Sequence, residues 1–153
     1  MHKEKKLTKS IWIVIMILSL LLIAMPLSRI IVIVLTGSGS SFTPENLDEG
    51  AVASFNLLMI FWFMYSICGG FFGLFCSWWL KKKESFAWKL GVFWSLLLIL
   101  YGIIASLSEI LISWVHKPLV CPGLMSHIVF GVIALVCLLV TKKGFVQRET
   151  AES

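Results

Sequence analysis

The run from Phe86 to Val115 limits the possible folds of this chain more than any other stretch does. It is thirty residues long and carries no charge between Lys89 and Glu109. A helix needs about 20 apolar residues, rising 1.5 Å each, to cross the hydrocarbon layer of a bilayer. The run therefore predicts a membrane-spanning helix, and it places the carboxyl group of Glu109 inside the membrane.

The composition supports a bilayer environment for the rest of the chain. Hydrophobic residues make up 59% of the 153 residues and charged residues 14%, whereas soluble domains have about 45–50% and about 25%. A soluble core of this size cannot bury so much apolar surface. The net charge of +5 does not indicate nucleic-acid binding, because the basic residues gather in alternate polar segments, which is a topology signal.

Three further apolar runs complete a four-helix pattern. The sequence predicts helices over residues 11–35, 52–80, 86–115 and 123–141. The first run is too long for the apolar core of a signal peptide, which spans about 7–15 residues, although removal of this segment is the alternative. We expect a single membrane domain over residues 1–153, an all-α, antiparallel bundle of four transmembrane helices with short loops.

The distribution of charge predicts the orientation of this bundle. Eleven of the thirteen Lys and Arg residues lie in the first ten residues, in residues 81–89 and in the tail from residue 142. The loop over residues 37–50 contains three acids and no basic residue, and the second link on that side contains only Lys117. Because basic loops stay inside, both termini are expected in the cytoplasm, in a multi-pass protein of the cell membrane.

Each predicted helix carries one polar side chain at a similar predicted depth. These residues are Arg29, Asn56, Glu109 and His127. Charges in hydrocarbon usually face the bundle interior and pair, so we expect an Arg29–Glu109 ion pair with Asn56 and His127 as hydrogen-bonding neighbours. The functional hypothesis is a proton or substrate site, which Pro26 could widen by kinking the first helix. The alternative is a structural clamp, or an Arg29 that reaches the headgroups alone.

Small residues form stripes on three of the predicted helices. Such stripes let helix backbones approach closely in membranes, and the spacing of Gly69 and Gly73 matches the GxxxG pattern. The pattern does not say whether the partner helix lies in this chain or in another one. The predicted packing seam consists of Gly69, Gly70, Gly73, Gly102, Ser106 and Gly131.

Enzymatic, metal and cofactor chemistry have little support in the sequence. The four cysteines form no CxxC pair, and Glu109, His116, Cys121 and His127 lack the spacing that fixes two metal ligands on one face. No nucleophile–base pair or phosphate-binding glycine loop is present. We therefore expect no catalytic residue, no metal and no cofactor.

Two functions remain open at this stage. The favoured hypothesis is a non-catalytic accessory or self-associating protein that contacts the lipid bilayer and either a second copy or a larger membrane complex, without nucleic acid. The alternative is a small oligomeric carrier or channel that uses Glu109 together with Arg29 and His127. Four short helices leave little room for alternating access within one protomer, so a carrier would need an oligomer.

Overall fold

The computed structural model describes the backbone of residues 2–36, 49–82, 85–116 and 122–149. Within these residues it is all-helical and contains no strand. The helices are α1 (His2–Thr36), α2 (Glu49–Lys82), α3 (Ser85–His116) and α4 (Pro122–Glu149). Each of the four contains a stretch that is long and apolar enough to cross a membrane: Ser10–Val32, Asn56–Lys82, Phe86–Ser108 and Met125–Lys142.

Several sequence-based expectations lie outside the described residues. They concern residues 37–48 of the predicted acidic loop and the link over residues 117–121 with Lys117 and Cys121. The last two residues of the predicted loop, Glu49 and Gly50, instead begin α2. The backbone of Glu109 is described as part of α3, but its side chain is not, so the predicted ion pair to Arg29 also lies outside the described part of the chain.

All four helices are longer than the apolar runs that predict them, and α1 and α4 each extend more than two turns beyond their runs at one end. Helix α1 begins at His2 instead of residue 11, and α4 ends at Glu149 instead of residue 141. The added turns contain Lys, Glu, Gln and Arg, which are good helix formers. Hydropathy marks the apolar part of a helix, whereas backbone propensity decides how far the helix continues beyond it.

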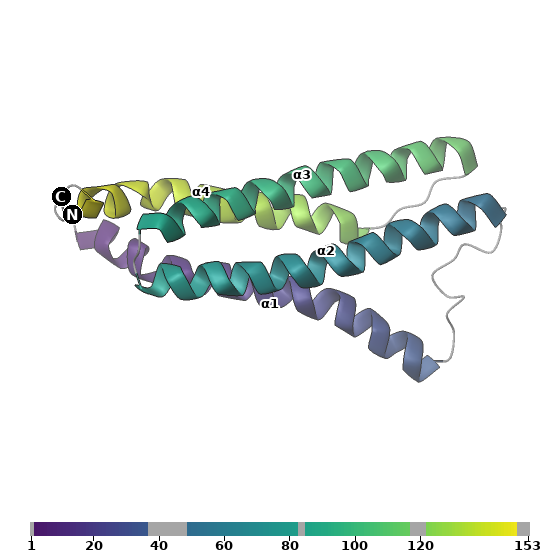
Figure 1. Cartoon of the computed structure of the whole chain (residues 1–153), viewed down its shortest axis with the longest axis horizontal. Coiled ribbons are helices and arrows are strands. Elements are labelled where there is room, and N and C mark those ends of the chain that lie inside the picture. The colour runs from purple at the N-terminus through teal and green to yellow at the C-terminus, as the bar shows by residue number, and fades with distance from the viewer. Residues whose placement is uncertain (1, 37–48, 83–84, 117–121, 150–153) are drawn as a thin grey trace.

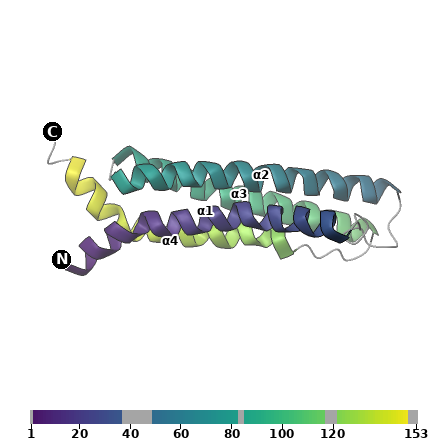
Figure 2. The same cartoon turned by 90° about the horizontal axis from the view of Figure 1, so that it is seen from below.

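The four helices form an antiparallel bundle in which each helix packs against the next in sequence. The most extensive packing lies within the pairs α1–α2 and α3–α4, and α4 also packs against α1. The beginning of α1 and the end of α4 lie at the same end of the bundle (Figures 1 and 2). At the opposite end, α4 begins well short of the level that α2 and α3 reach (Figure 1).

Helix α1 leaves the bundle in its last third. Pro26 lies within the helix and is buried, and a proline inside a helix removes a backbone hydrogen bond and promotes bending. The end of α1 lies apart from α2 in Figure 1. Of the described side chains after Pro26, all are exposed except Arg29, which is half-buried, and Leu35 is 79% exposed.

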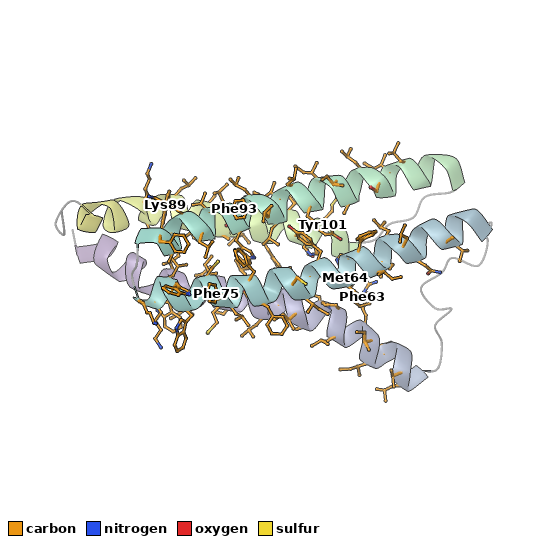
Figure 3. The ribbon with its side chains drawn as sticks, viewed as in Figure 1. Phe63, Met64, Phe75, Lys89, Phe93 and Tyr101 are labelled. Carbon is orange, nitrogen blue, oxygen red and sulfur yellow. The ribbon has the colours of Figure 1, made fainter. Side chains whose placement is uncertain are left out.

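Large apolar side chains cover the outside of the bundle as well as forming its core, and every buried polar side chain of the described residues except His127 is small. Phe, Leu, Ile and Val side chains project outward along all four helices, as Figure 3 shows for Phe75 and Phe93. The buried polar residues are Ser19, Ser66, Ser77, Ser95, His127 and Thr141. A monomeric soluble protein rarely exposes so large a contiguous apolar surface.

Glycines of the predicted seam lie where helix backbones come closest. A Cβ on Gly70 would meet the side chain of Ile23 and, at 2.9 Å, the carbonyl oxygen of Ser19 in α1. A Cβ on Gly131 would lie 2.8 Å from the carbonyl oxygen of Ser95 in α3. A Cβ on Gly102 would lie 2.9 Å from the backbone nitrogen of Ile128 in α4. These positions allow α1 to pack on α2 and α3 on α4 at backbone distance.

Two other seam glycines have side chains as their neighbours. Gly73 lies against the hydroxyl of Ser19 and the indole of Trp94, whose Cζ2 would be 2.6 Å from an added Cβ. Gly69 differs, because an added Cβ would meet only Leu98 Cδ2, at 3.6 Å, which is ordinary van der Waals contact.

We predict that Gly70→Ala destabilises the bundle by about 1–3 kcal/mol, because the added methyl group forces backbone apart from backbone. Gly69→Ala is the matched control in the same helical turn, and it should be neutral or slightly stabilising because alanine favours helix. Unfolding in mixed micelles with increasing SDS measures both. Equal stability of the two variants would contradict the close approach of α1 to α2.

Candidate functional site

His127 lies at the centre of a polar and aromatic cluster inside the bundle. It is in the second turn of α4 and its side chain is fully buried. Its Nε2 atom lies 3.0 Å from the hydroxyl oxygen of Ser66 in α2, a hydrogen bond between two buried side chains. Ser66 precedes Gly70 by one helical turn and lies on the same face of α2, so its hydroxyl projects toward the helices that α2 packs against.

Aromatic rings from α2 and α3 enclose the imidazole. Tyr65 and Tyr101 stack with their ring centroids 3.7 Å apart and their planes 11° apart. The His127 ring meets the Tyr101 ring edge to face at a centroid distance of 5.1 Å. Tyr65 donates a hydrogen bond from its hydroxyl to the carbonyl oxygen of Leu97, at 2.8 Å. This bond anchors the stacked pair to the backbone of α3.

Two further polar atoms in this region are enclosed without a hydrogen-bond partner among the described residues. They are the hydroxyl oxygen of Tyr101 and that of Ser106, one of the predicted seam residues. Both belong to α3 and lie within five residues of each other. Unsatisfied buried hydroxyls are uncommon in native proteins, so these two hydroxyls distinguish this part of α3.

Helix α1 contributes Arg29 to the edge of the cluster. Its guanidinium carbon lies 5.2 Å from the centroid of the Trp62 ring, a cation–π geometry. Trp62 is buried and its ring lies 6.5 Å from the His127 ring, edge to face. Arg29 of α1 and His127 of α4 therefore both lie beside the Trp62 ring.

The structure does not bring Asn56 to this cluster. Its side chain is exposed, and it precedes Ser66 by ten residues, which is about 15 Å along a helix. A Cβ added to Gly102 would lie 3.4 Å from the Cβ of His127, so Gly102 marks the level of His127 on α3. Glu109 follows Gly102 by seven residues, which is about 10 Å further along α3. Asn56 and the backbone of Glu109 thus lie at other levels than His127, because α4 begins deeper in the bundle than α2 and α3 reach (Figure 1).

Sequence reasoning did not single out Trp62, Tyr65, Ser66 or Tyr101 as site residues. One signal was available, because Tyr65 and Tyr101 are the chain's two tyrosines, and both lie in predicted spans. Tyrosine within a membrane span needs a partner for its hydroxyl group. The pairing itself depends on the register between α2 and α3, which the sequence does not give.

The cluster has the chemistry of a helix contact. No group of three or more His, Cys, Asp or Glu side chains that could hold a metal lies together in the described part of the chain. The groups present offer hydrogen bonds, ring stacking and one cation–π contact, and they join α1, α2, α3 and α4. Neither a protein-family model, nor a curated protein, nor a solved structure matches the chain.

We predict that Ser66→Ala lowers the stability of the bundle by roughly 1 kcal/mol, because interhelical hydrogen bonds in membranes average about 0.6 and reach about 1.7 kcal/mol. Ser108→Ala is the control, since the Ser108 hydroxyl donates only to the carbonyl of Ile104 in its own helix, at 2.9 Å. SDS-induced unfolding compares the two. A loss in Ser108→Ala that equals the loss in Ser66→Ala would argue against a stabilising contact at His127.

Proposed function

We propose that this chain is a multi-pass protein of the cell membrane that crosses the bilayer four times. The single observation that carries the proposal is the exposure of large apolar side chains along all four helices, while serine, threonine and histidine side chains are buried among the apolar core residues. Such an arrangement is stable only where the surrounding solvent is itself apolar. In hydrocarbon, helices satisfy their own backbone hydrogen bonds, and small residues form the contacts between them.

The proposed orientation places both termini in the cytoplasm. The segments over residues 1–10, 81–89 and 142–153 contain eleven basic and four acidic residues, a net charge of +7. The segments over residues 37–50 and 117–121 contain one basic and three acidic residues, a net charge of −2. The difference of nine charges between the two sets favours the first on the cytoplasmic side.

We predict that reporters of sidedness fused at residue 1 and at residue 153 both report the cytoplasm, because four crossings return the chain to its starting side. A third fusion within residues 37–48 serves as the control and should report the outside. Opposite readouts from the two termini, or recovery of the protein in detergent-free buffer, would refute the proposal.

The role that we propose is non-catalytic and depends on contacts between helices. The six polar residues that are buried as a whole all hydrogen-bond within the chain, whereas the enclosed hydroxyls of Tyr101 and Ser106 have no partner among the described residues. Three of the six join different helices, through the Ser66–His127 bond and through the bond from Ser77 to the carbonyl of Trp12, at 2.8 Å. The others bond to their own helices. Polar groups used in this way support packing, which suits an accessory or self-associating protein.

The outward face of α2 is the surface that we propose for self-association. Its exposed residues recur every three or four positions and are mostly aromatic or sulfur-containing, whereas those of α1 and α4 are mostly aliphatic. Rings and sulfur atoms pack favourably against one another. The residues of this face are Leu57, Phe61, Met64, Cys68, Phe71, Phe75 and Trp78.

Cysteine cross-linking tests this surface. With Cys68 as the only cysteine, oxidation in native membranes should give a disulfide-linked dimer, because Cys68 is exposed on the proposed face. The control is a cysteine-free chain with Val132→Cys, a position on the outer face of α4 that is 44% exposed. It should remain monomeric. Equal dimer yields from both positions, or no dimer from Cys68, would contradict self-association through α2.

A further inference from the structure

Lysine side chains lie over tryptophan rings at the basic end of the bundle. The ammonium nitrogen of Lys81 lies 5.1 Å from the ring centroid of Trp12 and 5.9 Å from that of Trp78. The nitrogen of Lys82 lies 5.8 Å from Trp78 and 5.2 Å from Trp79. These five residues, from α1 and α2, form a lysine–tryptophan cluster.

The cluster is tied to the bundle at its base. Ser77, one turn before Lys81, donates a hydrogen bond to the carbonyl of Trp12 at 2.8 Å, which joins the two helices that carry the cluster. Trp12 and Trp79 are half-buried, whereas Trp78 is 60% exposed. The rings therefore form a fixed base for the two lysines, with Trp78 under both of them.

The lysines keep donors available to a ligand. Lys81 and Lys82 are exposed, and an ammonium group has three N–H donors, of which a ring face engages only one side. Holding the two side chains over rings also reduces the rotamer entropy that binding would otherwise cost. Two exposed ammonium groups are thus held near the same indole ring, at 5.9 and 5.8 Å from its centroid.

We propose that the lysine–tryptophan cluster binds the phosphate of an anionic phospholipid headgroup. The proposal rests on the membrane insertion proposed above, which puts these residues at the headgroup level, where tryptophan rings concentrate. Charge complementarity identifies the occupant, because the segments at this end carry a net charge of +7 and the headgroup is negative. The indole rings contact the glycerol and upper acyl region, while the ammonium groups contact the phosphate.

A second pair at this end repeats the geometry on the other hairpin. Lys142 of α4 lies 5.8 Å from the ring centroid of Trp88 in α3. The indole nitrogen of Trp88 donates to the carbonyl oxygen of Leu138 at 2.8 Å, which fixes the ring between the two helices. Both hairpins thus present a lysine over a tryptophan at the same end of the bundle.

Brominated lipids provide the test, because bromine quenches tryptophan fluorescence on contact. The full chain is reconstituted in phosphatidylcholine vesicles that contain either brominated phosphatidylglycerol or brominated phosphatidylcholine at the same fraction. Phosphatidylglycerol should quench more strongly, which gives a relative affinity above one. Lys81→Ala should reduce this relative affinity about fivefold, the equivalent of the roughly 1 kcal/mol that a basic residue contributes at an anionic surface.

Two further variants separate a defined site from general attraction. Lys89→Ala removes one positive charge at the same end, from the start of α3 (Figure 3), and should leave the relative affinity nearly unchanged. Trp78→Leu keeps an apolar side chain but removes the ring under both lysines, and should reduce the affinity as Lys81→Ala does. Equal losses in Lys89→Ala and Lys81→Ala, or no loss in Trp78→Leu, would overturn the proposal.

The experiment also separates this proposal from the one on which it rests. Quenching by both lipids to the same extent would leave insertion intact and refute the lipid site. Absence of quenching by either lipid would refute insertion itself. Glycerol phosphate added in solution provides the last arm, because displacement of phosphatidylglycerol by this soluble anion would show that the cluster binds free phosphate esters and would overturn the lipid assignment.

Discussion

The bundle depends on small residues where two helix backbones meet. Gly70 lies against the backbone of Ser19, and Gly131 lies against the backbone of Ser95. Between helices in hydrocarbon there is little hydrophobic driving force, so close van der Waals contact and a few hydrogen bonds hold the helices together. Both require that the backbones come near each other. Large side chains lie both outside, as Phe71 does, and in the core between the helices, as Trp94 and Leu138 do.

The same constraint keeps most of the polar groups in the largely apolar interior small. Serine and threonine are almost as small as alanine, and their hydroxyls bond to carbonyls within the chain. At one level a larger polar group, the imidazole of His127, is accommodated by Ser66 and by the stacked tyrosines. Tyr65 packs with the main core and Tyr101 with the smaller core around Trp62, so their stacked rings connect the two.

The two ends of the bundle differ in the side-chain contacts that their helices make. At the end where α1 begins, lysines of α2 lie over tryptophans of α1 and α2, and Ser77 donates a hydrogen bond to the carbonyl of Trp12. At the other end, α1 bends away after Pro26, and of its described side chains there Arg29 is half-buried and the others are exposed. Its contact with Trp62 links the departing helix to α2. The polar cluster around His127 thus lies between the lysine–tryptophan cluster at one end and the departing part of α1 at the other.

The sequence by itself determined the four helices, because apolar runs of sufficient length and the prolines between them are local properties of the chain. It also marked Gly70 and Gly131 as contact residues, since small residues on one face have a period that can be counted. Only the tertiary structure decided which polar side chains meet. Depth counted from the ends of apolar runs assumes that the helices end at the same level, and α4 does not (Figure 1). The register between helices therefore placed Ser66 and Tyr101 beside His127, and left Asn56 about two to three turns away.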